Sequence, residues 1–269
     1  MADPLTELFD DLHDEHEALD AVVAPLSDER WDARTPAAGW RVRDQIGHLA
    51  YFDEAGRQAA VDPDGFVAGR DRGLADLDAF TAQTERLGRE LTGFMLLAAW
   101  RAARAAMLDA LADLAASDAS ARLPWYGPPM SLRSFATARL METWAHGQDV
   151  VDGLGLPLDA RPVTDRLRHI AFLGCATRGW SYVVRDRVAP DTPVRVELSL
   201  PSGATFINGG DDAEDVVRGS ALDFCLVVTQ RRNVADTGLS VVGPAAREWL
   251  SIAQCFAGGA TLPPAPRSG

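Results

Sequence analysis

The sequence is poor in cysteine, and its three cysteines, Cys175, Cys225 and Cys255, lie far apart without a C-x-x-C pair. An odd and scattered set argues against a disulfide framework and fits a reducing compartment. No run of about 18 uncharged apolar residues is present, so no transmembrane helix is predicted. The N-terminal stretch is acidic and amphipathic, unlike a signal peptide. We therefore expect a cytoplasmic protein with no membrane partner.

Basic residues are also in short supply, with 26 Lys and Arg against 39 Asp and Glu, which gives a formal net charge of −13. Such a chain repels phosphate backbones, so no nucleic-acid partner is expected. A glycine-rich phosphate loop is missing too, because Gly209 and Gly210 lie in a turn that acidic residues follow. A length of 269 residues with 47% hydrophobic and 24% charged residues is typical of a folded protein of one or two domains, and we expect two.

What the first half does contain is helical periodicity. Apolar residues over 5–23 predict an amphipathic helix behind a proline, and a second helix begins near residue 42. A run of strong helix formers over 94–114 predicts a third, and 131–153 predicts a fourth with a serine cap and a glycine end. The segment 62–73 is rich in Gly and Asp and predicts a loop.

The pattern of apolar residues changes after residue 155. One further helix is predicted over 163–184, and the segments VRVELSL, ATFIN and LDFCLVVTQ predict strands of a small antiparallel sheet, with a last helix over 245–256. The predicted fold class is therefore α+β. We expect a helical bundle over 1–155, an α+β domain over 156–262 and a flexible tail over 263–269.

Two ligand-type residues share one face of the fourth predicted helix, because Glu142 and His146 are four positions apart. His48, in the middle of the second helix, could add a third metal ligand, and three protein ligands leave a coordination position open for water or substrate. The alternative is that His146 bonds Glu142 within its helix while His48 is an ordinary core histidine. Spacing alone favours neither interpretation.

The stretches GWRVRDQIGHLAYFD around His48 and RLMETWAHGQDVVDGLG around Glu142 and His146 resemble the metal-binding stretches of the mycothiol-dependent maleylpyruvate isomerase family, a branch of the DinB-like superfamily. Trp40, eight residues before His48, fits the same pattern. The resemblance covers essentially the whole chain, and it is closest to an actinobacterial metal-binding subgroup with a wyosine-type C-terminal domain. It implies a DinB-like four-helix bundle followed by a sterol-carrier-like domain.

The resemblance also implies a divalent metal held by His48, Glu142 and His146, with zinc first and nickel or iron as alternatives. Mycothiol would be the co-substrate, because a thiol bound to zinc loses its proton near neutral pH and becomes a nucleophile. An arginine after a strand of the second domain would hold a substrate carboxylate, which points to Arg231 or Arg232 as catalytic residues. The alternative for these two arginines is a plain surface turn.

Two further residues are candidates for cofactor binding. His16 continues the apolar stripe of the first helix and is predicted to face the bundle interior, where it either contacts the cofactor or is an ordinary buried histidine. Asp149 follows Glu142 by seven residues on the same face, where it could orient a ligand or add a carboxylate to the metal. The alternative for Asp149 is pairing with Arg139 or with solvent.

Three functions remain open at this stage. The first is a metal- and thiol-dependent isomerase or S-transferase that acts on a small electrophilic or carboxylate-bearing molecule. The second uses a metal-bound water for hydrolysis without a thiol. The third is a non-enzymatic binder of an apolar small molecule with a structural metal. The expected partners are a small-molecule substrate and a low-molecular-weight thiol, and the chain is expected to be a monomer or a homodimer.

Overall fold

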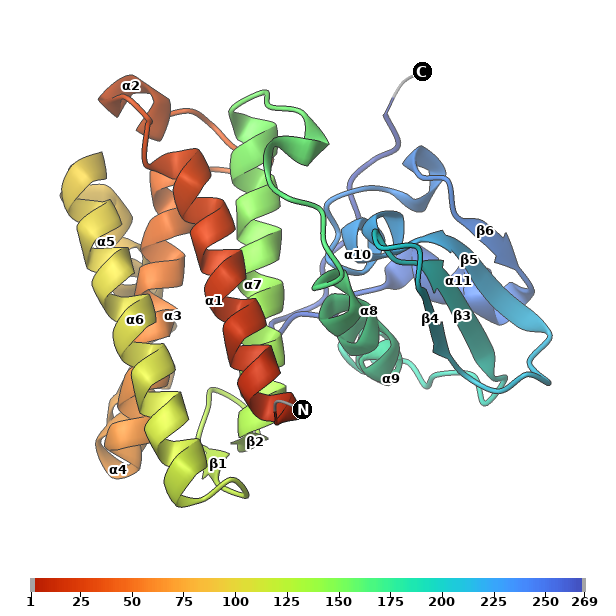
Figure 1. Ribbon diagram of the computed structural model, residues 1–269, viewed down its shortest axis with the longest axis horizontal. Coiled ribbons are helices and arrows are strands. Elements are labelled where there is room, and N and C mark those ends of the chain that lie inside the picture. The colour runs from red at the N-terminus through yellow and green to blue at the C-terminus, as the bar shows by residue number, and fades with distance from the viewer. Residues whose placement is uncertain (1–2, 268–269) are drawn as a thin grey trace. The chain divides into compact units, whose positions relative to one another are not determined.

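A computed structural model describes residues 3–267 of the chain. The chain divides into two compact units, Met1–Arg161 and Pro162–Gly269. The first unit runs from red to green in Figure 1, and the second unit follows in green to blue. The boundary therefore lies a few residues beyond the position after residue 155 at which the sequence analysis divided the chain.

The first unit is almost entirely helical. Its helices are α1 (Pro4–Val23), α2 (Asp28–Trp31), α3 (Val42–Val61), α4 (Pro63–Leu74), α5 (Leu77–Glu90), α6 (Gly93–Ser117) and α7 (Leu132–Gly153), and a 3-10 turn covers Leu158–Ala160. Two short strands, β1 (Arg122–Leu123) and β2 (Met130–Ser131), pair antiparallel before α7.

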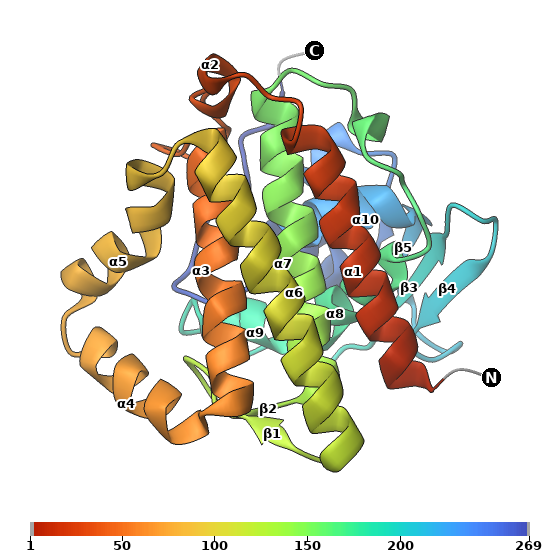
Figure 2. The same cartoon turned by 60° about the vertical axis from the view of Figure 1, so that its left-hand side comes forward.

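Four of these helices, α1, α3, α6 and α7, run side by side as a bundle, as Figure 2 shows. Each helix turns its apolar stripe inward, and burial of one such side chain stabilises the fold by about 1.5–3 kcal/mol. The four expected helices are therefore confirmed. One core cluster consists of Leu19, Val23, Trp31, Val42, Ile46, Leu49, Ala50, Leu96, Leu97, Trp100, Val150 and Leu154.

Side-chain caps fix where the bundle helices begin. The hydroxyl of Ser131 accepts a hydrogen bond from the backbone N–H of Ser134 at the start of α7, as the sequence analysis expected. The carboxylate of Asp44 accepts from the backbone N–H of Arg41 at 2.8 Å at the start of α3. These caps give partners to backbone N–H groups at the helix starts that have none within the helix.

The expectation of a loop over 62–73 is wrong, because this segment forms α4. Pro63 suits the first turn of a helix, and the Asp62 carboxylate caps it by accepting from the backbone N–H of Gly65 at 3.0 Å. Phe66 is the one buried residue of this helix and ties it to the unit. In Figure 2, α4 and α5 lie outside α3 as a pair of peripheral helices.

The second unit is a small sheet covered by helices. It contains α8 (Leu167–Ala176), α9 (Arg178–Val183), β3 (Val194–Ser199), β4 (Thr205–Asn208), β5 (Asp215–Ser220), α10 (Ala221–Val228), a 3-10 turn (Val234–Asp236), β6 (Ser240–Val242) and α11 (Pro244–Ile252). The strand order is β4-β3-β5-β6, and β3 pairs antiparallel with β4 but parallel with β5. The α+β class is confirmed, and the sheet is mixed where an antiparallel sheet was expected.

The segment LDFCLVVTQ is helical where a strand was expected, so Arg231 and Arg232 follow helix α10 and not a strand. The hydroxyl of Ser220 caps this helix by accepting from the backbone N–H of Asp223 at 3.0 Å. A continuous apolar run does not distinguish a buried strand from a buried helix by its periodicity. The strand of this region is β5, which ends at Ser220, immediately before the helix.

The single helix expected over 163–184 is divided into α8 and α9 at Thr177. The Thr177 hydroxyl donates to the carbonyl of Leu173 at 2.7 Å, which supplies a side-chain partner at the end of α8. The last expected helix corresponds to α11, whose Trp249 is buried against Phe224 of α10. Among the helices of residues 3–267, none is long and apolar enough to cross a bilayer.

Candidate metal centre

The bundle brings together the three residues that the sequence analysis selected as metal ligands. One ligand-type atom from each of His48, Glu142 and His146 lies within 4.8 Å of the others. His48 comes from the middle of α3, whereas Glu142 and His146 lie one turn apart on α7. The two imidazole rings are 4.5 Å apart between centroids. Within residues 3–267 this is the one group of three such side chains with that spacing.

The donor set and its spacing fit a divalent metal. Zinc binds imidazole nitrogen and carboxylate oxygen at about 2.0–2.2 Å, so two ligands of a tetrahedral ion lie roughly 3.3 Å apart. His146 Nε2 and Glu142 Oε2 are 3.2 Å apart, which already meets this requirement. The side chains of His146 and Glu142 keep 12% and 23% of their accessible surface, so the group can be reached from solvent.

The protonation state of Glu142 also suits a metal ligand. Burial by itself raises the pKa of this carboxyl, but the hydrogen bond from His146 and the charges of His146, His48 and Arg139 outweigh it and lower the pKa to about 2. Glu142 is therefore ionised at neutral pH and offers a negative charge to a cation.

Gln45 holds the ring of His146 from the side away from Glu142. Its Oε1 lies 2.5 Å from His146 Nδ1, and its Nε2 donates to the hydroxyl of Thr35 at 2.9 Å. Because an amide oxygen only accepts, Nδ1 of His146 carries a proton, and Nε2, which faces Glu142, is the atom that would bind a metal. Gln45 was not predicted from the sequence. Its signal there is an amide side chain one turn before His48, and the structure shows that it is buried.

Trp40 covers both imidazoles. Its ring stacks on His146 at 5.9 Å with an interplanar angle of 18°, and it lies 5.3 Å from the ring of His48. The loop that carries Trp40 is fixed by the hydroxyl of Thr35, which donates to the Trp40 carbonyl at 3.1 Å. Thr35 therefore connects Gln45 to Trp40, so that a single hydrogen-bonded chain positions both neighbours of His146.

A buried polar layer joins the two ligand-bearing helices one turn away from the three candidate ligands. Asp53 on α3 accepts from Arg139 on α7 at 2.8 and 3.1 Å, and also from the indole N–H of Trp100 on α6 at 3.1 Å. Both members of this ion pair are buried. The alternative for Asp149 was pairing with Arg139 or with solvent, and the guanidinium of Arg139 contacts Asp53.

His16 belongs to this polar layer and not to the group of three. It is fully buried, its Nε2 is 4.0 Å from Asp53 Oδ2, and its ring meets Trp100 edge-on at 6.0 Å. Burial, followed by the positive charges of Arg104 and Arg139, holds the pKa of His16 well below its usual value. The ring is therefore neutral at physiological pH. Its expected contact with a cofactor stays a prediction.

The other candidate residues lie outside the group of three. Asp149 is buried on α7, two turns after Glu142. Arg231 and Arg232 belong to the second unit, where their side chains donate to the backbone carbonyls of Thr229 and Arg231 at 2.6 and 2.7 Å. Arg232 is buried, which differs from the plain surface turn that was the alternative. The proposed roles of these three residues stay predictions.

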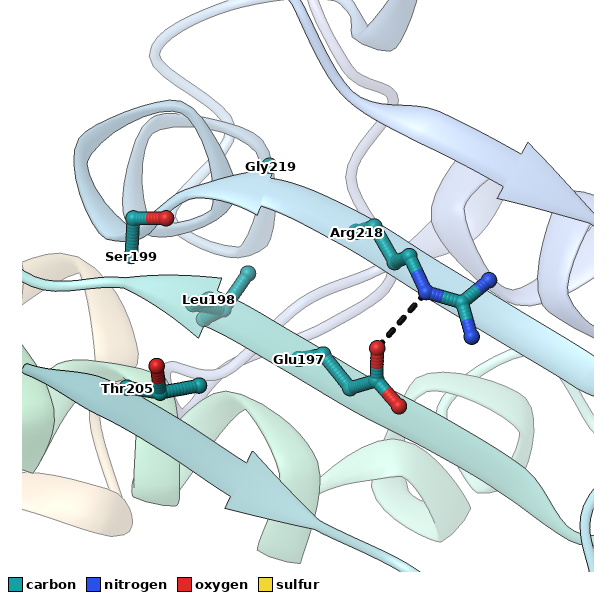
Figure 3. A pocket seen from close by; sticks show the side chains of 6 residues that line it. All are labelled: Glu197, Leu198, Ser199, Thr205, Arg218 and Gly219. Atoms are coloured by element: carbon teal, nitrogen blue, oxygen red, sulfur yellow. Dashed lines mark hydrogen bonds and ion pairs between the residues drawn. The ribbon is translucent and has the colours of Figure 1, made fainter. Parts of the chain in front are cut away.

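The second unit has a hollow of its own on the sheet, lined by Glu197, Leu198, Ser199, Thr205, Arg218 and Gly219 (Figure 3). Glu197 accepts from Arg218 at 2.6 Å, as Figure 3 shows, and from Arg195 at 2.5 Å. The two charged residues that line the hollow, Glu197 and Arg218, thus pair with each other. We assign the hollow no function.

The fold and the site together define a class: a helical bundle with a His-His-Glu group, joined to a small α+β unit. Residues 12–151 match the family model described as the mycothiol maleylpyruvate isomerase N-terminal domain. The chain therefore belongs to the mycothiol-dependent maleylpyruvate isomerase family, as the resemblance in its sequence implied.

Relatives and solved structures agree with this assignment. Two proteins of Mycobacterium tuberculosis, from strains CDC 1551 / Oshkosh and ATCC 25618 / H37Rv and both named as uncharacterized, are each 44% identical over 258 residues, which is 96% of this chain and 98% of theirs. The crystal structure of the mycothiol-dependent maleylpyruvate isomerase is similar with a TM-score of 0.58 and 16% identity, over 88% of this chain and 92% of that one. The crystal structure of a histidine-to-alanine mutant of that enzyme gives a TM-score of 0.55 at 15% identity, over 85% and 90%. At these identities the structures show the shared fold.

Proposed function

We propose that the protein is a metal-dependent enzyme that uses a low-molecular-weight thiol, mycothiol, to act on a small electrophilic molecule as an isomerase or an S-transferase. The observation that supports this most is the convergence of His48, Glu142 and His146 from two helices. The use of mycothiol is inferred from the family assignment and from the name of the structurally similar isomerase.

The residues of the chain have distinct tasks in this proposal. His48, Glu142 and His146 would hold the metal, proposed to be zinc, which would supply a positive charge that lowers the pKa of a bound thiol. Gln45 keeps the proton of His146 on Nδ1, and Trp40 shields the imidazoles from solvent on one side. Where the substrate has a carboxylate, Arg231 or Arg232 would bind it.

Where the electrophile is an activated carbon–carbon double bond, the two reaction types share their first step. The thiol adds across an activated carbon–carbon double bond, so that a C–S bond forms and the thiol proton ends on the neighbouring carbon. An S-transferase releases this adduct. An isomerase lets the new single bond rotate and then eliminates the thiol, which breaks the same C–S bond and returns the proton, so that no thiol is consumed.

Turnover by variants of the ligands tests the proposal. The zinc-loaded protein with mycothiol should convert electrophiles faster than the buffer control, and His146→Ala should abolish the difference. His13→Ala is the matched control, because His13 is exposed on α1 and should leave activity unchanged. Conversion at the same rate without any thiol would support the metal-bound water mechanism instead. Metal removal that lowers only the melting temperature, with no turnover by the loaded protein, would support a non-enzymatic binder.

A further inference from the structure

Aromatic rings continue from the candidate ligands into the first unit. The ring of Phe52, one turn after His48 on α3, contacts the His48 imidazole at 4.6 Å. Phe52 in turn contacts Tyr126 at 5.6 Å and Trp125 at 6.2 Å, both from the loop between β1 and β2. Tyr126 reaches Phe80 of α5 at 5.3 Å. These rings, together with Trp40 and Tyr51, are here called the aromatic cluster.

The exposure of this cluster distinguishes it from the core of the bundle. Trp40, Tyr51, Phe52, Phe80, Trp125 and Tyr126 are all half-buried, so each ring keeps part of its surface accessible. The core positions of the same helices are closed, with Ile46 and Leu49 of α3 fully buried. Leaving six large rings partly exposed side by side forgoes hydrophobic stabilisation, and such patches commonly mark binding sites.

Part of the cluster also contributes to the packing of the peripheral helices. Phe66 is the buried anchor of α4, and it stacks on Trp125 at 5.6 Å with an interplanar angle of 1°. The end of α5 packs on α3 through two glycines, because a Cβ on Gly47 would lie 2.6 Å from the backbone nitrogen of Gly88. The cluster therefore helps to hold α4 and α5, while the part of each ring that stays accessible makes no such contact and is open to a ligand.

The charges around the cluster argue against an anionic ligand. Arg70 donates to the carbonyl of Trp125 and pairs with Asp71 at 2.7 Å. The arginines that flank Trp40, Arg41 and Arg43, both pair with Asp32 at 3.2 and 3.1 Å. All three of these guanidinium groups thus have an acidic partner within the part of the chain that the structure describes. A neutral, flat ring suits this environment better than a small dicarboxylate.

We infer that the aromatic cluster binds the substrate of the proposed enzyme and that this substrate is a neutral, planar aromatic electrophile. The ring of the substrate stacks on Phe52, Tyr126 and Phe80, which places its reactive carbon toward His48. Burial and a hydrogen bond with Tyr51 raise the pKa of Tyr126, so its hydroxyl stays protonated and adds no negative charge to the cluster. The inference rests on the proposed function for the reaction, but the binding can be tested without turnover.

The binding experiment uses 1,3-dinitrobenzene, a planar neutral ring without a leaving group, titrated calorimetrically into the zinc-loaded protein. Tyr126→Leu and Phe80→Leu keep apolar volume but remove the ring, and each should raise the Kd about three- to tenfold, as expected for loss of one aromatic pair. Phe94→Leu is the matched control, because Phe94 is 82% exposed on α6 outside the cluster. Equal Kd values in all four proteins would overturn the inference, and bound zinc and melting temperature show whether each variant is folded.

The turnover experiment compares mycothiol transfer to 1-chloro-2,4-dinitrobenzene and to iodoacetamide. In both reactions a C–S bond forms, the carbon–halogen bond breaks, and halide and a proton are released. Tyr126→Leu should lower kcat/KM about three- to tenfold for the aromatic reagent and leave the aliphatic reagent unchanged. Equal losses for both reagents would contradict the inference while leaving the proposed function standing. If the wild type converts neither reagent, the proposed function fails for them, and the calorimetric result alone decides the binding claim.

Discussion

At the level of single residues, the geometry of the candidate metal centre depends on side chains that bind no metal themselves. Gln45 is the clearest case, because its amide oxygen selects the protonated nitrogen of His146 while its amide nitrogen is held by Thr35. Partners of this kind orient a metal-binding imidazole and raise its basicity.

We expect Gln45→Leu to weaken zinc binding by about 10- to 100-fold, because His146 loses the acceptor that fixes its tautomer and ring orientation. Competition with a chelator of known affinity measures this. Gln83→Leu, an exposed change on α5, is the matched control and should bind zinc like the parent. Unchanged affinity in the folded Gln45 variant would show that the hydrogen bond does not position the ligand.

The lowered pKa of His16 leads to a prediction of how the free energy of unfolding depends on pH. Its pKa in the folded protein lies below the unfolded value near 6.5, because burial and then Arg104 and Arg139 disfavour the charged ring. The folded state therefore binds fewer protons, so this contribution to stability is present above about pH 6.5 and is lost as the pH falls, at up to about 1.4 kcal/mol per pH unit.

The measurement is the free energy of unfolding by denaturant at pH 7.5 and 5.5, with a chelator present so that metal release does not contribute. His16→Phe should lose less stability on acidification than the parent, whereas His13→Phe, an exposed change on the same helix, should behave like the parent. The same acid loss in all three proteins would mean that His16 is not the titrating group.

At the level of elements, the buried pair of Asp53 and Arg139 connects the two helices that carry the candidate ligands. It fixes α3 against α7 one turn from His48 and Glu142, and Trp100 adds a contact from α6. Removing one partner leaves the other charge buried without compensation, which is strongly destabilising.

Asp53→Leu should therefore destabilise the protein by about 3–5 kcal/mol, and the double variant Asp53→Leu/Arg139→Leu should recover part of that loss. Chemical denaturation gives both values. For comparison, Glu85→Ala removes the half-buried partner of the exposed Arg89 on α5 and should cost less than about 1 kcal/mol. If the double variant is instead less stable than Asp53→Leu, the two side chains do not act as a pair, and this account is contradicted.

Helices were predicted well from the sequence where a capping residue and a regular helical spacing of apolar residues coincide. The α7 helix has a serine cap, a regular apolar stripe and a glycine end, and its limits were expected almost to the residue. The segment 62–73 predicts a loop because it is rich in Gly and Asp, but the cap by Asp62 and the burial of Phe66 stabilise it as a helix. In LDFCLVVTQ the five central residues, FCLVV, are all apolar, so their periodicity does not distinguish a strand from a helix, and the Ser220 cap marks the start of the helix.

The same distinction applies to the site. His48, Glu142 and His146 were found because ligand residue types recur at helical spacing and match a family pattern. Gln45, Thr35 and the contact of Asp53 with Arg139 were not found, because they depend on how two helices and a loop meet in space. Asp53 did carry a signal, since a carboxylate on the apolar stripe of α3 must have buried partners.

At the level of the whole molecule, the candidate ligands belong to the first of two compact units. A ligand stabilises the structure that binds it by about 2.7 kcal/mol when its free concentration is 100 times the Kd. We expect zinc to slow amide hydrogen exchange in α3 and α7 more than in β3 and β5 of the second unit. Equal protection in both units would contradict a metal held by the bundle alone.

The most direct test of the account is the stoichiometry of metal binding. Calorimetric titration of zinc into the chelator-treated protein should give one bound ion per chain, and His48→Ala, Glu142→Ala and His146→Ala should each lose most of that binding while His13→Ala keeps it. A parent protein that binds no zinc, or single variants that bind it as tightly as the parent, would contradict the claim that these three side chains form a metal centre.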